Sequence, residues 1–172
     1  MNLQSDDFEL FGVARRFTQD RAQLDARWKE LQRQAHPDRF ASEGAAAQRV
    51  AMQWSVRINE AYQRLKDPLA RAAYLCELGG APVRAEDNTA MPTQFLMQQM
   101  ERREALDDAH DAQQIDALGL VVKNAERDAL AQCAALLDEA HDHAGAAQQV
   151  RALMFLARFA RSVEQRADQL GQ

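Results

Sequence analysis

Hydrophobic residues recur every three or four positions through most of the chain, which is the spacing of one face of an α-helix. Within residues 21–35, the positions at this spacing are Leu24, Trp28, Leu31 and Ala35. No stretch alternates apolar and polar residues with the β-branched enrichment of a strand. The pattern therefore predicts an all-α protein.

Helix-ending residues divide the first half of the chain into four predicted helices. A short helix over residues 7–12 ends at Gly12. The second starts after Asp20, which is an N-cap residue type, and Pro37 stops it. The third begins near Ser42 or Glu43 and ends at Asp67, and its apolar stripe includes Val50, Trp54, Ile58, Ala61 and Leu65. The fourth runs from Pro68 to Gly79-Gly80. The two long helices are expected to pair antiparallel, with Trp28, Trp54, Tyr62 and Tyr74 in or near the core.

The second half predicts a separate bundle. Residues 80–92 have few large apolar side chains and two prolines, which is typical of a linker. Three helices follow, at roughly 93–110, 114–141 and 146–170, and their short connections predict an antiparallel three-helix bundle. The expected buried stripes are Ile115, Leu118, Val122, Ala125, Ala129, Cys133, Leu136 and Ala140, then Leu153, Leu156, Ala160, Val163, Ala167 and Leu170. The predicted domains are thus residues 1–79 and 93–172, joined by 80–92.

Composition narrows the classes of function. The 172 residues are 47% hydrophobic and 27% charged, with a net charge of −5. Residues 1–78 carry +1 and the remainder −6, which argues against nucleic-acid binding. No apolar run is long enough to cross a membrane, and no secretory signal opens the chain, so a cytoplasmic protein is expected.

Candidate metal ligands are sparse. Cys76 and Cys133 lie far apart without CxxC spacing, and we interpret them as free thiols on helix faces in a reducing compartment. His141 and His143 point to different faces of a helix. The sequence therefore predicts neither a metal site nor a cofactor.

The tripeptide His36-Pro37-Asp38 stands between the two long helices and is followed by Arg39 and Phe40. We interpret it as an exposed loop that presents an imidazole and a carboxylate on a proline-stiffened turn. This arrangement suits docking onto a partner better than catalysis. Lys29 and Arg33 are four residues apart, on the side of their helix opposite the apolar stripe.

The segment FLMQQMERREALDDAH has more apolar faces than the edge of a bundle needs. At about 100° per residue, Phe95, Arg102 and Leu106 share one face, which we assign to the core. Elsewhere on this helix three apolar residues adjoin three carboxylates, and this set comprises Leu96, Met97, Met100, Glu101, Glu104 and Asp108. Periodicity leaves two interpretations open, a partner-binding patch or the flank of a broad core beside a solvated acidic face. Phe155 lies off its own stripe and extends the patch if the first and last bundle helices are neighbours.

Several segments resemble a known family. DFELFGV, WKELQRQA, HPDRF and INEAYQRLKDP are similar to the J domain of DnaJ-type co-chaperones. LQRQAHPDRFAS, DPLARAAYLCEL and FLMQQMERREALD narrow the resemblance to the HscB family, the co-chaperones of iron–sulfur cluster assembly. The chain resembles the bacterial form, without the N-terminal zinc-binding extension of some eukaryotic members.

The resemblance implies two protein partners and no enzymatic activity of its own. An HscA-type ATPase chaperone would contact His36, Pro37, Asp38, Lys29, Arg33 and Arg39. An IscU-type iron–sulfur scaffold would contact Leu96, Met97, Met100, Glu101, Glu104, Asp108 and Phe155. No membrane partner or cofactor is implied, and a monomer or weak dimer is expected.

Three other interpretations compete. A general DnaJ-type co-chaperone would usually add Gly/Phe-rich or β-rich client-binding regions, which the sequence lacks. An enzyme could use His36 and Asp38 as an acid–base pair, but no nucleophile or phosphate-binding glycine motif accompanies them. A helical adaptor that has lost its chaperone partner would not need an intact His36-Pro37-Asp38.

Overall fold

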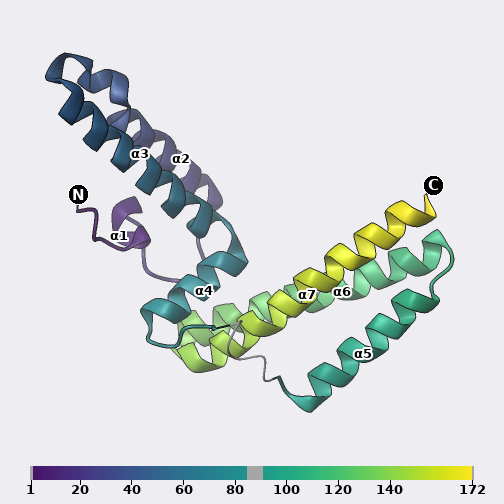
Figure 1. The fold of residues 1–172 in the computed structure, drawn as a ribbon. Helices are drawn as coiled ribbons and strands as arrows, with labels where there is room; N and C mark the ends of the chain where they lie inside the picture. Colours follow the sequence, from purple (N-terminus) through teal and green to yellow (C-terminus); the bar gives the residue numbers. More distant parts are fainter. Residues whose placement is uncertain (1, 85–90, 172) are drawn as a thin grey trace. The chain divides into compact units, whose positions relative to one another are not determined.

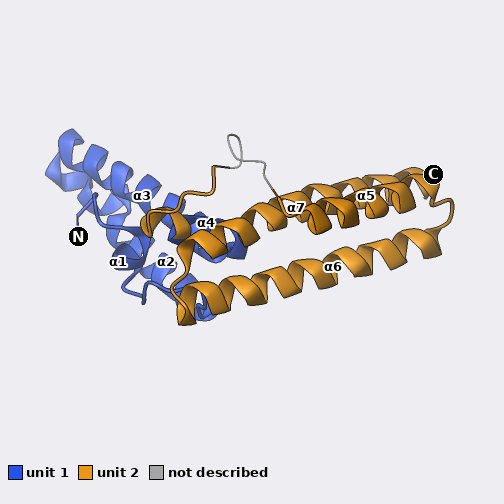
Figure 2. Ribbon diagram, turned by 90° about the horizontal axis from the view of Figure 1, so that it is seen from below, with its two compact units in different colours: residues 1–75 blue, residues 76–172 orange. Residues whose placement is uncertain are grey.

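The computed structural model describes residues 2–84 and 91–171, and within these ranges the chain is helical with no β-strand (Figure 1). It divides into two compact units, Met1–Leu75 and Cys76–Gln172 (Figure 2). The division falls inside α4 (Pro68–Leu78), before the end of the first domain predicted at residue 79. Part of the predicted linker, residues 85–90, lies outside the described residues. The all-α prediction is confirmed.

Unit 1 is built around two long helices, α2 (Arg21–Ala35) and α3 (Ala45–Lys66), which run side by side in opposite directions (Figure 1). Before them lies the short helix α1 (Asp7–Phe11). The predicted helix ends are confirmed where a side chain or a glycine determines them. Asp20 accepts hydrogen bonds from two backbone N–H groups of α2, and Gly12 ends α1 with a φ of 64°.

The core of unit 1 largely follows the predicted stripes, although Trp28 and Trp54 are only half-buried. Leu24, Leu31 and Ala35 on α2 are buried, as are Ile58, Ala61 and Leu65 on α3. Val50, predicted to be buried, is 50% exposed, and Ala51 is buried instead. Ala51 precedes Ile58 by seven residues, which is close to two full helical turns, whereas Val50 lies a further 100° round the helix.

A buried carboxylate, not anticipated from the sequence, ties α1 to α3. The Asp7 side chain is inaccessible to solvent and lies 2.8 Å from Nη1 of Arg57. Arg64 donates to it from Nε at 2.5 Å and from Nη2 at 3.0 Å. The hydroxyl of Tyr74 accepts a hydrogen bond from the Asp7 backbone N–H at 3.0 Å. Since a buried charge is tolerated only when it is paired, this cluster determines where α1 packs.

Unit 2 is an antiparallel three-helix bundle, as predicted (Figure 2). Its helices are α5 (Thr93–Asp108), α6 (Ala112–Ala134), which continues as the π-helix η2 (Ala135–Glu139), and α7 (His143–Leu170). One core cluster joins all three helices and comprises Leu106, Ala109, Ile115, Val122, Phe159 and Val163.

The π-helix η2 changes which residues of α6 face the core. A π-helix bonds each N–H to the carbonyl five residues back, so one extra residue enters the turn and later side chains rotate. The N–H of Ala140 accordingly donates to the carbonyl of Ala135. Leu137 is therefore buried, whereas Ala140, predicted to be buried, is exposed and Leu136 is half-buried.

The α7 stripe also needs correction near its C-terminus. Ala167 and Leu170 are exposed, because α7 extends past the last core residue, Val163, of the bundle's central cluster. Phe159, which the predicted stripe omitted, is only 3% exposed. It lies three residues after Leu156 and therefore belongs to the same face.

Both cysteines are buried free thiols, as expected. Burial raises the pKa of the Cys76 thiol to about 11 and that of Cys133 to about 12. Because the thiolate is the reactive form, neither residue is suited to nucleophilic or redox chemistry.

Candidate functional site

His36, Pro37 and Asp38 lie between α2 and α3, as predicted, but they start a short 3₁₀-helix, η1 (Pro37–Glu43), instead of an irregular exposed loop. His36 ends α2 in an extended conformation, and Pro37 occupies the first helical position, where its missing N–H costs nothing. The Nδ1 atom of His36 accepts a hydrogen bond of 3.2 Å from the Asp38 backbone N–H. The imidazole therefore serves as the N-cap of η1.

This capping bond determines what the tripeptide offers to a partner. A neutral imidazole that accepts at Nδ1 carries its proton at Nε2. The side chain of His36 is 59% exposed and that of Asp38 is 92% exposed. The chain thus presents a hydrogen-bond donor and a free carboxylate, with Nδ1 of His36 and Oδ2 of Asp38 3.6 Å apart. Their exposure fits binding to another protein.

The basic residues beside the tripeptide are exposed, but Arg33 is already paired. It donates to the Glu30 carboxylate from Nε at 3.1 Å and from Nη2 at 2.7 Å. The bonds from Arg33, then from Gln34, lower the pKa of Glu30 to about 2. Lys29 and Arg39 are exposed, and Nη1 of Arg39 lies 3.5 Å from the Arg33 carbonyl.

The second candidate surface lies on α5 in unit 2. Leu96 is 41% exposed, Met97 57% and Met100 64%, whereas Leu106 on the other face is 4% exposed. Phe95 and Arg102, both assigned to the core face, are half-buried. The three carboxylates Glu101, Glu104 and Asp108 are exposed. The apolar patch is therefore at the surface and is not the flank of a broad core.

Phe155 on α7 joins this surface, because α5 and α7 are neighbours. Its ring meets that of Phe95 edge to face, with centroids 6.0 Å apart. A groove of ≈ 640 Å³ runs between the two helices, and we call it the α5–α7 groove. Its lining comprises Leu96, Gln99, Met100, Arg103, Glu104, Phe155, Arg158 and Phe159.

The structure therefore brings together four of the seven residues predicted to bind a scaffold, namely Leu96, Met100, Glu104 and Phe155. Met97, Glu101 and Asp108 are exposed on α5 but do not line the groove. The sequence analysis missed Arg103, Arg158 and Phe159. Helical spacing carried a signal for them, since Arg158 and Phe159 follow Phe155 by three and four residues.

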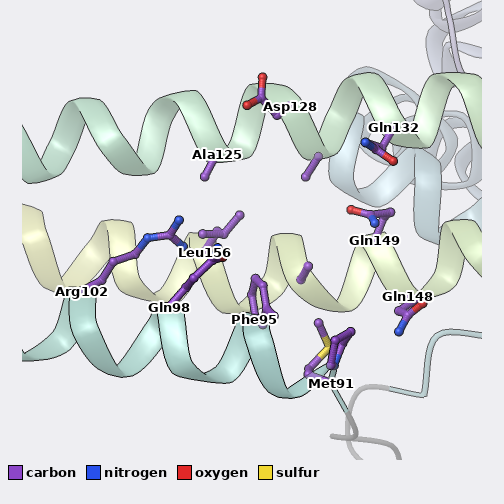
Figure 3. A pocket seen from close by; sticks show the side chains of 13 residues that line it. Met91, Phe95, Gln98, Arg102, Ala125, Asp128, Gln132, Gln148, Gln149 and Leu156 are labelled. Atoms are coloured by element: carbon purple, nitrogen blue, oxygen red, sulfur yellow. The ribbon is translucent and has the colours of Figure 1, made fainter.

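A second hollow, of ≈ 370 Å³, is open to solvent and is lined by residues of α5, α6 and α7 (Figure 3). Its lining is mixed, with Phe95 and Leu156 beside Gln98, Arg102 and other polar groups. The well-packed core cluster instead involves the C-terminal part of α5, through Leu106 and Ala109. The N-terminal half of α5, which carries the exposed apolar patch, thus lies beside a solvent-open, partly polar hollow.

Within the described residues, no group of three or more His, Cys, Asp or Glu side chains could hold a metal ion. None of the helices described has both the length and the apolar character to cross a membrane.

Comparison with known proteins identifies the class. Residues 91–164 match the family described as the HSCB C-terminal oligomerisation domain. The chain is 47% identical to a co-chaperone protein HscB homolog of Burkholderia mallei over 173 aligned positions, covering 99% of this chain and 98% of the relative. Chaperone HscB from Vibrio cholerae matches with a TM-score of 0.82 and 36% identity, covering 96% of this chain and 99% of that one. Human co-chaperone protein HscB matches with a TM-score of 0.89 and 25% identity, covering 96% and 83% respectively.

An antiparallel helix pair with an exposed His-Pro-Asp, followed by a three-helix bundle, defines a J-type co-chaperone. The chain belongs to the HscB family, the J-type co-chaperones of iron–sulfur cluster assembly. Its partner is accordingly a chaperone of that process.

Proposed function

We propose that the protein stimulates the ATPase of an HscA-type chaperone and delivers an IscU-type scaffold to it. The observation that carries the proposal is the presence of two exposed binding surfaces on separate units. Unit 1 presents His36 and Asp38, and unit 2 presents the apolar–acidic surface around Leu96 and Met100. Binding both partners at once makes the encounter of scaffold and chaperone nearly intramolecular.

The chaperone-binding surface consists of the tripeptide and its basic surroundings, Lys29, Arg33 and Arg39. The exposed carboxylate of Asp38 can form a charge-assisted hydrogen bond with a chaperone arginine, while Nε2–H of His36 donates beside it. The basic side chains speed and orient the encounter with an acidic partner surface, so their contribution falls as salt is added.

The scaffold-binding surface comprises the α5–α7 groove and the adjoining residues Met97, Glu101 and Asp108. Exposed apolar side chains such as Leu96 and Met100 gain most from burial by a partner, and methionine adapts to varied partner shapes. Glu101, Glu104 and Asp108 form an acidic rim that favours basic groups on the scaffold. The protein acts by binding and not as an enzyme, and its proposed site of action is the cytoplasm.

The two surfaces can be tested independently. His36→Gln should abolish stimulation of the purified chaperone's ATPase while leaving helical content and scaffold affinity unchanged. The double variant Met97→Ala, Phe155→Ala should lose scaffold affinity, by about 2 kcal/mol or more as for interface anchors, and keep basal ATPase stimulation.

The outcomes separate the parts of the proposal. Undiminished stimulation by the His36→Gln variant would refute the role of the tripeptide. Recovery of another client, but no scaffold, from the native cell extract would favour a general DnaJ-type co-chaperone instead.

A further inference from the structure

We propose that Arg103 and Arg158 form a carboxylate-binding edge of the α5–α7 groove. The scaffold segment that fills the groove would then carry an acidic side chain next to its apolar anchor. This inference rests on the proposed scaffold binding and specifies the chemistry that the groove recognises. It adds two cations to a surface that the sequence analysis described only as apolar and acidic.

Each arginine lies against one of the two rings in the groove. The guanidinium of Arg158 is 5.5 Å from the centre of the Phe155 ring, and that of Arg103 is 5.7 Å from the centre of the Phe159 ring. Both arginines line the groove and are exposed. A guanidinium held against an aromatic face loses less freedom on binding, because its position is already restricted.

Neither guanidinium is neutralised within the part of the chain that the structure describes. Neither Arg103 nor Arg158 forms an ion pair or a side-chain hydrogen bond there. Other arginines of unit 2 do have partners: Arg102 donates to Gln99, Arg151 to the Val83 carbonyl and Arg166 to the Ala109 carbonyl. Arg103 and Arg158 therefore keep all their donors for a ligand, beside the apolar surface of Leu96 and Met100.

The charges around the groove are arranged unequally. At about 100° per residue, Arg103 lies about 20° from Leu96 on one side. On the other side, Glu104, which also lines the groove, lies about 80° round, and Glu101 and Asp108 lie about 120–140° round. Arg158 is contributed by α7, across the groove. The groove thus has a basic edge toward α7 and an acidic rim on the outer face of α5. A segment with a carboxylate on one side of its anchor and a basic group on the other fits in one orientation only.

Charge complementarity of this kind makes a specific prediction. A carboxylate placed against a planar guanidinium forms paired, charge-assisted hydrogen bonds, and the apolar groove reduces competition from water. A neutral or basic segment would leave two cations unpaired when it buried them. A scaffold segment with a carboxylate at this edge should therefore bind much more tightly than the same segment with the corresponding amide.

The test measures affinity for a purified IscU-type scaffold by calorimetry at low salt. Arg158→Glu should weaken binding at least about tenfold, and Arg158→Gln should weaken it less. Arg161→Glu is the matched control, because Arg161 is exposed on α7 and does not line the groove. It should change affinity by no more than about twofold. Arg158→Lys should restore only part of the affinity, since an ammonium cannot bind a carboxylate in the paired geometry.

A charge exchange then identifies the carboxylate. Each surface Asp or Glu of the scaffold is replaced by Lys and tested against the Arg158→Glu variant, and one replacement should restore binding. The carboxylate-binding edge would be overturned if the Arg158→Glu and Arg161→Glu variants bound the scaffold with equal affinity while Leu96→Ala still lost binding. The proposed scaffold binding would then stand. Unchanged affinity in Leu96→Ala as well would overturn the scaffold surface itself.

Discussion

The ring of Phe155 on α7 meets the ring of Phe95 on α5 edge to face, with centroids 6.0 Å apart. The two rings differ in what else they contact. Phe155 lines the α5–α7 groove, whereas Phe95 lines the solvent-open hollow between α5, α6 and α7. One contact therefore links the surface proposed to bind the scaffold to the side of α5 that faces the rest of the bundle. The two residues allow binding and packing to be separated by mutation.

Phe155→Ala should lower both scaffold affinity and bundle stability. Loss of an aromatic anchor from the groove is expected to cost about 2 kcal/mol of binding free energy. Loss of the Phe95 contact and of buried area should cost about 1–3 kcal/mol of unfolding free energy. Titration calorimetry measures the first, and urea unfolding followed by circular dichroism measures the second.

Phe95→Leu is the control for that prediction. It removes the same ring contact without altering a groove-lining side chain, so it should destabilise the bundle by about 1 kcal/mol and leave scaffold affinity within about twofold. Equal losses of affinity in both variants would show that Phe155 acts through the position of α5 and not through direct contact.

Glu30→Gln should speed association with the HscA-type chaperone at low salt. Glu30 holds both Nε and Nη2 of Arg33, and its removal frees that cation for an acidic partner surface. We expect a two- to threefold rise in association rate, of the order typical for one exposed charge, and its disappearance at high salt. Glu60→Gln removes the same charge from an exposed position on α3 and is the control. A comparable gain in both variants would show that only net charge matters.

The Glu30 pKa predicts how this effect depends on pH. Hydrogen bonds from Arg33 hold that pKa at about 2, below its ordinary value of 4.5. A lowered acidic pKa means that any stabilisation from the pair is complete above about pH 4.5 and is lost as the pH falls toward 2. The ratio of association rates for the Glu30→Gln variant and the parent protein should therefore stay constant from pH 8 to pH 5, as stopped-flow mixing can check.

Periodicity and capping residues predicted the helices well, because each signal is local. Asp20 and Gly12 end their helices where the sequence indicated. Periodicity also placed Leu96, Met97 and Met100 away from Leu106 on α5, but it left open whether they flank a broad core, and only their exposure in the structure decides this. Local geometry thus accounts for most of the helices and places the apolar residues proposed to bind the scaffold on one helix.

What the sequence could not show depends on tertiary contacts. The π-helix η2 moves Leu137 into the core, and an ideal 3.6-residue period has no means of anticipating it. The buried charge of Asp7 depends on Arg57 and Arg64, fifty or more residues away. The cations of the groove are likewise recognised as part of the surface only once α5 and α7 are known to be neighbours.

Asp7→Asn should destabilise unit 1 strongly. The substitution removes the negative charge between Arg57 and Arg64, leaving two cations in a site where the carboxylate is fully buried. Breaking a buried ion pair by removing one partner typically costs about 3–5 kcal/mol. Both tryptophans, Trp28 and Trp54, belong to unit 1, so their fluorescence during urea unfolding reports this unit selectively.

The same substitution at an exposed position is the control. Asp38→Asn changes a side chain that is 92% exposed, so it should alter the unfolding free energy by less than about 0.5 kcal/mol. A small loss in the Asp7→Asn variant, comparable to that control, would mean that water or a shift of α1 satisfies the two arginines.

Gly79→Ala should destabilise unit 2, because the His143 ring occupies the space of the new methyl group. A Cβ on Gly79 would overlap Cδ2 of the His143 ring, so the ring must move. Such overpacking costs about 1–3 kcal/mol.

In a His143→Ala background the clash is gone, and Gly79→Ala should be neutral or stabilising by up to about 1 kcal/mol, because alanine restricts the unfolded chain. Gly80→Ala is the control, because its φ of 82° disfavours alanine with or without His143, and a Cβ there would meet nothing within 4 Å among the described residues beyond its chain neighbours. Urea unfolding followed by circular dichroism measures the unfolding free energies of the single and double variants. The effects of Gly79→Ala and His143→Ala should not add, whereas those of Gly80→Ala and His143→Ala should add. Additive effects at both glycines would contradict the packing described.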